Sequence, residues 1–278
     1  MDDSAENNLK KLLHSSSYRV AYKDVQFLAS GPLRATRMEL EFLKPELTLK
    51  EQEVHSTIVV FGSTQISEPE EAQDQLERAR AFLADTPDDP RRQRTVARAE
   101  RIVAKSRYYE LAREFSRLVS ASCQVHGQCD YVVVTGGGPG IMEAANRGAF
   151  DVKAKSIGLN IRLPREQTPN PYISPELCFQ FHYFALRKFH FILRAKALVV
   201  FPGGFGTLDE LFDALTLRQT NRMQDIPIII FGREYWENVI DFQYLADEGT
   251  IEDDDLDLFS YAETAEEAWD MIRQFHHN

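Results

Sequence analysis

Two hydrophobic patterns follow one another along this chain. In the first half, Thr57–Phe61 is a short β-branched run closed by Gly62 and Ser63, which is typical of a buried parallel strand and the loop after it. Residues 67–84 and 91–122 have the spacing of helices instead, with the proline-containing sequence "DTPDDPRRQ" between them. This half therefore predicts one strand followed by two long, charged helices.

The second of these helical segments has an aromatic face. Tyr108, Leu111, Phe115 and Leu118 recur at intervals of three and four residues, so they lie on one side of a helix. Such a face usually packs on the core of its own domain. It is also the segment from which we would expect an interface between subunits.

In the second half, short apolar runs alternate with helical patterns and with two glycine-rich loops. This alternation predicts an α/β fold, a Rossmann-like doubly wound parallel sheet with helices on both faces. Ligands of such sheets bind at the carboxyl ends of the strands, where both glycine-rich loops fall. The expected segments are strand, loop and helix at 131–150, a strand at 156–163, a helix at 183–195, strand, loop and helix at 197–216, a strand at 226–232 and a closing helix at 263–275.

Length and composition indicate how the chain is organised. Its 278 residues, 43% of them hydrophobic, suffice for one large core with appendages. We expect an N-terminal extension over residues 1–50 and a Rossmann-like domain over residues 51–278. A charged helical insertion at about 68–107 interrupts this domain.

Charge and cysteine content exclude several classes of protein. A formal net charge of −11 argues against a nucleic acid partner, so a phosphate ligand would be bound locally in a pocket. Cys123, Cys129 and Cys178 have neither the number nor the spacing of a disulfide framework or a zinc site, and no metal cluster is visible. The N-terminus lacks a signal-peptide pattern, and no apolar stretch reaches the ~20 residues of a membrane span. We therefore expect a cytoplasmic protein with no membrane partner.

The first glycine-rich loop, "TGGGPG", precedes a helix that begins near Ile141. The N–H groups of a helix start lack partners and attract anions, so Gly136, Gly137, Gly138 and Gly140 form a candidate phosphate site. The spacing lacks the last glycine of a dinucleotide fingerprint, and neither loop has the G-K-[ST] ending of a P-loop. A tight strand-to-helix turn without a ligand is the alternative explanation.

The second loop, "PGGFGT", contains Gly203, Gly204 and Gly206 and leads into another helix. Thr207 and Glu210 have the T-x-x-E spacing of a capping box, which would explain both residues without any catalytic role. Two such loops on one sheet nevertheless favour a nucleotide held between them.

The helix expected at 183–195 supplies the third element of a site. Arg187 has a planar, permanently charged group that binds phosphate or carboxylate with two hydrogen bonds, and a surface ion pair is its alternative role. Lys188 is either a ligand or a solvated charge. We interpret His190 as a packed helix residue rather than a catalyst.

These residues carry a resemblance to a known family. The sequences "PGGFGTLDE" (Pro202–Glu210) and "TGGGPGIMEAANRGA" (Thr135–Ala149), together with Arg187 and Lys188, resemble the LOG ("Lonely Guy") family of cytokinin-activating phosphoribohydrolases. Members of this family have also been labelled possible lysine decarboxylases. The resemblance covers roughly residues 56–232, and the long additional segments are similar to those of the larger bacterial branch.

The resemblance implies hydrolysis of the N-glycosidic bond of a purine nucleoside 5′-monophosphate, AMP or an N6-modified adenine nucleotide, to free base and ribose 5-phosphate. Arg187 and Glu210 would be the catalytic pair, with Arg187 keeping Glu210 ionised. Such a nucleosidase needs no cofactor and forms a homodimer or a higher homo-oligomer. The implied substrate-binding residues are Gly137, Gly138, Met142, Glu143, Lys188, Gly203, Gly204, Gly206 and Thr207.

Two other functions compete with this one. A pyridoxal-phosphate lysine decarboxylase would need a lysine for a Schiff base, and neither Lys188 nor Lys196 stands in a context that favours it. A non-catalytic nucleotide-binding sensor or carrier on the same fold would keep both loops but could dispense with Arg187 and Glu210. The presence of both residues favours the enzyme.

Overall fold

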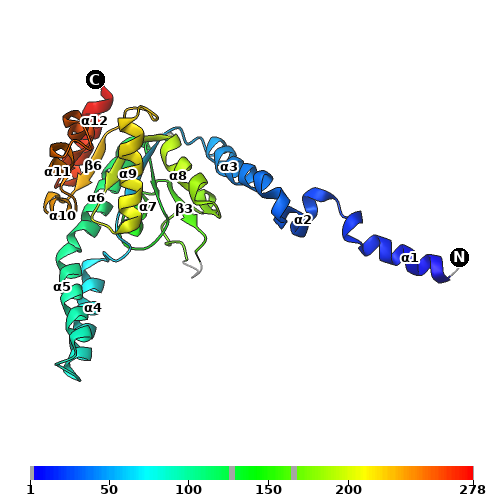
Figure 1. The fold of residues 1–278 in the computed structure, drawn as a ribbon, viewed down its shortest axis with the longest axis horizontal. Coiled ribbons are helices and arrows are strands. Elements are labelled where there is room, and N and C mark those ends of the chain that lie inside the picture. The colour runs from blue at the N-terminus through cyan, green and yellow to red at the C-terminus, as the bar shows by residue number, and fades with distance from the viewer. Residues whose placement is uncertain (1–2, 125–128, 164–167, 278) are drawn as a thin grey trace. The chain divides into compact units, whose positions relative to one another are not determined.

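The computed structural model describes residues 3–124, 129–163 and 168–277 (Figure 1). The chain forms two compact units, Met1–Glu46 and Leu47–Asn278. In the described part of the chain, no helix has both the length and the apolar character needed to cross a membrane.

The first unit is a series of short helices. Asp24 begins one of them, because its carboxylate accepts hydrogen bonds from the N–H groups of Gln26 and Phe27, both at 3.1 Å. Tyr22 and Val25 are 72% and 74% exposed, so much of the apolar surface here is not packed into a core. The elements are α1 (Asp3–His14), η1 (Ser16–Tyr18), η2 (Ala21–Lys23), α2 (Val25–Ala29), η3 (Gly31–Leu33) and α3 (Arg34–Glu51), whose last residues belong to the second unit.

The second unit is built on a seven-stranded parallel sheet in the order β4-β3-β2-β1-β5-β6-β7, which confirms the predicted fold class. The chain moves outward from β1 to β4, then returns to the other side of β1 with β5. The loops after β1 and β5 therefore flank the point where the strand order reverses, the usual ligand site of such sheets. The strands are β1 (Thr57–Phe61), β2 (Val132–Thr135), β3 (Ser156–Ile161), β4 (Cys178–Phe181), β5 (Ala195–Val200), β6 (Ile228–Phe231) and β7 (Ser260–Ala262).

Helices cover both faces of this sheet, because successive strand residues point to opposite sides. Val59 and Phe61 pack in the core beneath α8 (Phe184–Leu193) and α9 (Phe205–Gln219), and α10 (Arg233–Val239) adds Trp236 to it. On the opposite face, Ile58 and Val60 share a core with three other helices, α6 (Arg107–Cys123), α7 (Ile141–Asp151) and α12 (Ala265–His277). The remaining elements are η4 (Pro175–Leu177), α11 (Phe242–Asp247) and η5 (Asp253–Leu258).

Two edge strands were not expected from the sequence. In β4, Phe179 and Phe181 are buried while Cys178 and Gln180 are exposed, which is the two-residue alternation of a strand with one covered face. Because this alternation extends over only four residues, the sequence did not separate the strand from the long loop around it. At the other edge, β7 has only three residues and no distinctive pattern.

The charged insertion is a helical hairpin of α4 (Pro69–Ala84) and α5 (Pro90–Lys105), which projects from the sheet (Figure 1). The segment expected as one helix over 91–122 is divided at Ser106 into α5 and α6. The Ser106 hydroxyl donates to the Val103 carbonyl at 2.7 Å and the Ser106 side chain is buried, so α5 ends there and α6 begins.

The aromatic face of α6 belongs to the core. Tyr108 and Phe115 are 3% and 0% exposed, and both pack in the cluster beneath α6. This face is therefore already used inside the domain and does not offer an interface to a second subunit.

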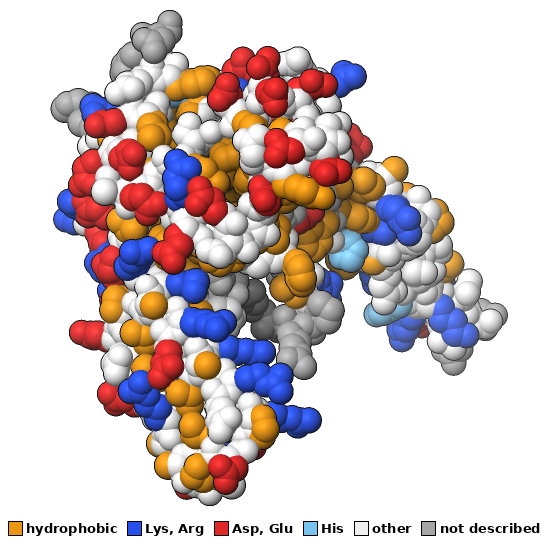
Figure 2. Space-filling view, turned by 60° about the vertical axis from the view of Figure 1, so that its left-hand side comes forward, with side chains coloured by type: hydrophobic (Ala, Val, Ile, Leu, Met, Phe, Trp, Pro, Cys, Tyr) orange, Lys and Arg blue, Asp and Glu red, His pale blue; other side chains and the backbone are white. Residues whose placement is uncertain are grey.

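Charge is distributed unevenly over the second unit. Helix α5 combines Arg91, Arg94, Arg98 and Arg101 with one acidic residue, Glu100, although the whole chain is strongly acidic. In Figure 2, Lys and Arg side chains line one side of the hairpin at the lower left, and Asp and Glu side chains crowd the upper part of the molecule. A local basic surface thus exists that the net charge did not reveal.

Candidate active site

The loop between β5 and α9 brings the second glycine motif to the carboxyl edge of the sheet. Gly203 is buried, and a Cβ atom there would lie 2.1 Å from Thr207 Oγ1, so only glycine fits against Thr207. Gly204 and Gly206 are exposed, and nothing lies within 4 Å of a Cβ built on either. The two glycines beside the helix start therefore leave their backbone open to a ligand.

The capping-box explanation for Glu210 does not hold. Helix α9 begins at Phe205 with Gly204 as its N-cap, and no side chain caps it. Thr207 is already the third helical residue, and its N–H bonds to the Gly204 carbonyl at 3.0 Å. Glu210 lies further along the helix and is only 8% exposed, so its burial needs another explanation.

Arg187 lies on α8 and extends to the same carboxyl edge of the sheet as the second glycine motif. Its Nε donates to the Leu159 carbonyl at the end of β3, at 2.7 Å. Its guanidinium carbon lies 5.1 Å from the ring centre of Phe191 and 5.8 Å from that of Phe184. A Cβ on Gly136 would lie only 2.4 Å from Arg187 Nη2. Gly136 therefore makes room for this guanidinium.

Burial dominates the electrostatics of the pair. Burial raises the pKa of Glu210 to about 7, although the charges of Arg187 and Lys188 act in the opposite direction. Arg187 thus favours the ionised form of Glu210 as expected, but its effect on the pKa is smaller than that of burial. Burial also lowers the pKa of Arg187, while the Glu210 charge raises it. Glu210 is poised to exchange a proton near neutral pH, as a general acid or base must.

Arg187 and Glu210 share a pocket of about 360 Å³. Four parts of the chain form it, the loop after β1, the start of α7, the start of α8 and the start of α9. Of the predicted residues, the pocket lining includes Met142, Arg187, Gly204, Gly206, Thr207 and Glu210. The lining also includes residues that were not predicted as site residues: Phe61, Gly62, Ser63, Thr64, Gln65, Phe184, Phe205 and Asp209.

The loop after β1 could have been found from the sequence. The motif "VVFGST" ends a central strand, and in doubly wound sheets the loops of the two strands at the reversal form the ligand crevice. Phe205 carried no such signal. Phe205 lines the pocket and is 92% exposed. It lies between Gly204 and Gly206, and the prediction for this motif rested on the glycines.

Within the first glycine loop, both backbone groups of Gly137 and the carbonyl of Gly138 are hydrogen-bonded within the protein. The Gly137 N–H donates to Thr135 Oγ1 at 3.0 Å, and its carbonyl accepts from the Asn170 N–H at 2.9 Å. The Gly138 carbonyl accepts from Asn170 Nδ2 at 3.1 Å. Neither residue is part of the pocket lining. Asn146, one turn beyond Met142 on α7, is fully buried, and its Oδ1 accepts a hydrogen bond from the Thr135 hydroxyl at 2.7 Å.

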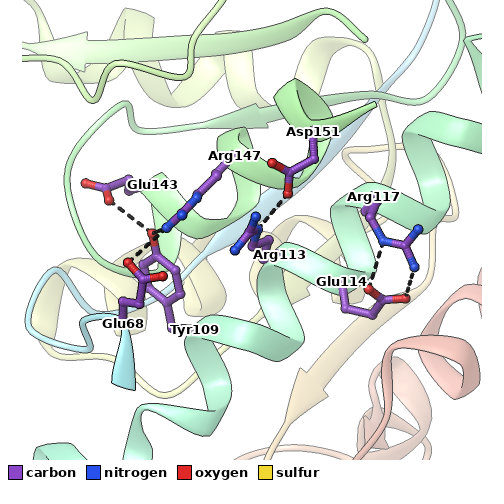
Figure 3. Close-up of polar contacts among 8 residues, drawn as sticks. All are labelled: Glu68, Tyr109, Arg113, Glu114, Arg117, Glu143, Arg147 and Asp151. Atoms are coloured by element: carbon purple, nitrogen blue, oxygen red, sulfur yellow. Dashed lines mark hydrogen bonds and ion pairs between the residues drawn. The ribbon is translucent and has the colours of Figure 1, made fainter. Parts of the chain in front are cut away.

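Glu143 and Lys188 are close to the pocket but have other partners. The Glu143 carboxylate accepts from the Tyr109 hydroxyl at 3.0 Å (Figure 3). Lys188 Nζ lies 2.9 Å from a carboxylate oxygen of Asp209 and 3.5 Å from one of Asp213. Gly203, buried behind the open part of its loop, accepts from the Tyr235 hydroxyl at 2.6 Å.

Fold and pocket define a doubly wound α/β protein with a buried acid and an arginine at the strand reversal. A family model described as "Possible lysine decarboxylase" matches residues 142–272, which include Arg187, Glu210 and the second glycine loop. This match is consistent with the LOG family, which the two motifs resemble. A search of curated proteins gives no match.

Three solved structures resemble the chain. The molybdenum cofactor binding protein from Rippkaea orientalis is 17% identical, with 60% of this chain and 87% of that one covered and a TM-score of 0.45. The structure of TM1055 is 20% identical, with 79% of this chain and 99% of that one covered and a TM-score of 0.47. The Moco carrier protein from Chlamydomonas reinhardtii is 18% identical, with 79% of this chain and 96% of that one covered and a TM-score of 0.44. At these identities and scores they carry no information about what this chain binds.

Proposed function

We propose that this protein hydrolyses the N-glycosidic bond of a purine nucleoside 5′-monophosphate, AMP or an N6-modified adenine nucleotide, to free base and ribose 5-phosphate. The observation that carries this proposal is the buried Glu210 carboxyl, with a pKa of about 7, beside Arg187 in a pocket with an open glycine wall. The family match over residues 142–272 and the resemblance to the LOG family support the same class of reaction.

The 5′-phosphate would bind at the start of α9. The N–H groups of Phe205 and Gly206 are the first of this helix, so they have no acceptor within it and point toward the pocket end. Gly204 and Gly206 carry no side chain that would block an approaching phosphate oxygen. The N–H of Thr207 is already bonded to Gly204, so it contributes less than the motif suggested.

Bond cleavage would then use Glu210. As the C1′–N bond breaks, its electron pair goes to the base nitrogen, and positive charge develops on the ribose ring. An ionised Glu210 stabilises that charge and accepts a proton from the water whose oxygen adds to C1′. The base nitrogen that received the electron pair takes up a proton from solvent, and Glu210 afterwards releases to solvent the proton that it took from water. Arg187 supports the ionised form of Glu210 against the burial that opposes it.

The decarboxylase label finds little support in the lysines. Burial lowers the pKa of Lys188, but the carboxylates of Asp209, Glu210 and Asp213 outweigh this and raise it. A Schiff base forms from an unprotonated amine, and this amine is held in its charged form by two ion pairs. After mixing with pyridoxal phosphate and removal of the free compound, the protein should therefore retain no absorbance from a bound Schiff base in the visible or near ultraviolet.

We further propose that the protein is a cytoplasmic homodimer whose interface uses the outer sides of α8 and α9. Phe184, Phe189 and Leu193 on α8 and Phe205 and Phe212 on α9 are all at least 38% exposed. Exposed apolar side chains gathered on neighbouring helices are typical of an association surface. Light scattering coupled to gel filtration measures the mass directly, and Phe212→Glu should lower it to that of one chain.

Product analysis tests the reaction. The wild-type protein is incubated with AMP, GMP, CMP and isopentenyladenosine monophosphate, and free base and ribose 5-phosphate are measured. We expect release from at least one purine nucleotide and a loss of about 10²–10⁴-fold in Glu210→Gln. Glu248→Gln, on the exposed surface, is the matched control and should keep full activity. Tight binding of AMP without any release would instead identify a carrier or sensor.

A further inference from the structure

One wall of the pocket is tied to α7 at two points. Residues 63–65 line the pocket directly after β1. At one end of this wall, the Ser63 carbonyl accepts the N–H of Ile141 at 3.1 Å. Just beyond its other end, Glu68 Oε2 lies 3.0 Å from Nη1 of Arg147. The wall is thus held between the first turn of α7 and a side chain further along the same helix.

Arg147 is itself held by a buried tyrosine. Its Nη1 lies 3.4 Å from the Tyr109 hydroxyl, and the Tyr109 residue is 1% exposed (Figure 3). The same hydroxyl donates to Glu143 Oε1 at 3.0 Å. Burial raises the pKa of Tyr109, so this phenol keeps its proton and remains a donor. The guanidinium of Arg147 also lies over the ring of Tyr172, at 5.4 Å.

Glu68 joins this network to the insertion. It is the N-cap residue of α4, so the last residue of the pocket loop is also the first anchor of the hairpin. Figure 3 shows Arg147 extending from α7 between Tyr109 and Glu68. A shift at the base of the hairpin would therefore be transmitted to residues 63–65 unless the ion pair held them.

We propose that Arg147 is a positioning residue for the nucleotide, which acts through Glu68 to fix the pocket wall formed by residues 63–65. The inference rests on the proposed function for the identity of the ligand. Arg147 is absent from the pocket lining, so it acts without touching the reacting atoms. Arg187 and Glu210 lie on other helices and keep their geometry when the wall loosens.

The expected effect is on binding more than on stability. The side chains of Arg147 and Glu68 are 22% and 38% exposed, and ion pairs of that exposure contribute little to global stability. A wall without its second anchor samples other conformations, and a ligand must order it again when it binds. KM should therefore rise while kcat stays near its wild-type value.

The experiment compares Arg147→Gln, Glu68→Gln and the double variant with Arg113→Gln. Arg113 pairs with Asp151 at 2.6 Å and links the same two helices, α6 and α7, away from the pocket loop (Figure 3). We expect KM for AMP to rise about three- to tenfold in either single variant, with kcat within about twofold. The double variant should be no worse than the singles, because both remove one interaction. Arg147→Lys should recover part of the affinity, and Arg113→Gln should keep the wild-type KM.

Hydrogen exchange of residues 62–68 gives a readout that does not depend on turnover. Exchange there should become faster in Arg147→Gln and Glu68→Gln but not in Arg113→Gln. Equal changes of KM and exchange in all three single variants, or additive effects in the double variant, would reduce Arg147 to a general structural role. If the wild-type protein neither binds nor hydrolyses any of the purine nucleotides tested, isopentenyladenosine monophosphate included, the proposed function fails and so does the nucleotide part of this inference. The exchange still decides whether Arg147 holds the wall.

Discussion

The two glycine-rich loops look alike in the sequence and differ in the structure. In "TGGGPG", Gly136 makes room for the Arg187 side chain and the N–H of Gly137 is bonded within the loop. In "PGGFGT", Gly204 and Gly206 are exposed and open toward the pocket. The first loop thus positions a protein group, and the second leaves its backbone free for a ligand.

Glycine spacing in a sequence therefore indicates that another group comes close to the backbone, but it does not indicate whether that group belongs to the protein or to a ligand. A missing Cβ is equally necessary where a side chain of the same protein passes and where a phosphate is bound. Only the surroundings distinguish the two cases. A substitution in the first loop should therefore lower kcat by displacing Arg187, whereas a substitution in the second loop should raise KM by obstructing the ligand.

Gly136→Ala should have the largest effect. The added methyl group would lie 2.4 Å from Arg187 Nη2 and 2.9 Å from Met142 Sδ. The ends of these two side chains must therefore move, while the fold remains intact because the three nearest atoms all belong to side chains. We expect kcat to fall about 10–100-fold, because small displacements of catalytic groups are costly, with little change in melting temperature. Steady-state kinetics and thermal unfolding measure both, and an unchanged kcat would show that Arg187 has no part in the reaction.

The pH dependence should be the next largest effect, and it originates in Glu210, which follows the second loop. With a pKa of about 7, the ionised fraction of Glu210 rises roughly tenfold between pH 6 and pH 8, and kcat should rise with it. Stability changes in the opposite direction. Because the folded-state pKa is raised, the protonated form stabilises the fold fully below about pH 4.5, and this contribution is lost as the pH rises to about 7.

Glu210→Gln is the control for that titration. Its unfolding free energy, measured in denaturant between pH 5 and pH 8, should lack the decline seen in the wild-type protein. A wild-type rate that is flat from pH 6 to pH 8 would contradict the assigned role of Glu210.

Gly204→Ala should have a smaller effect, confined to binding. Gly204 has φ −94° and ψ −154°, a conformation that alanine adopts, and nothing lies within 4 Å of the new methyl group. The melting temperature should therefore stay within a degree or two of wild type. The methyl group would project where the phosphate is expected, so KM for AMP should rise about three- to tenfold with kcat preserved. Calorimetric titration with AMP checks this, and an unchanged affinity would move the phosphate away from this loop.

Lys188→Gln should have the smallest effect. Lys188 is not part of the pocket lining and its ammonium is paired with Asp209 and Asp213, so we expect the maximal rate to change less than twofold. Lys188 lowers the pKa of Glu210, so its removal should shift the midpoint of the pH–rate profile upward. A large loss of rate at high pH would place Lys188 in direct contact with the substrate.

The sequence by itself determined the sheet and the segments that carry the chemistry. The bounds predicted for β1 agree with the structure, and the apolar runs of β2, β3, β5 and β6 were each found within a few residues. Burial on both faces of a parallel sheet produces continuous β-branched runs, which is a local and readable signal. The motifs that contain Arg187 and Glu210 were readable for the same reason, because each lies within one short stretch.

Only the tertiary structure decided how those segments work. The T-x-x-E spacing allowed Glu210 to be a capping residue, and the position of the helix start, two residues before Thr207, excluded it. The pKa of Glu210 depends on burial by other segments of the chain, which a local pattern does not contain. The pocket wall after β1 and its anchor Arg147 are more than 70 residues apart in the sequence. Burial, charge and contacts at such separations arise only when the sheet brings the segments together, and for that reason the sequence named the residues while the fold assigned their roles.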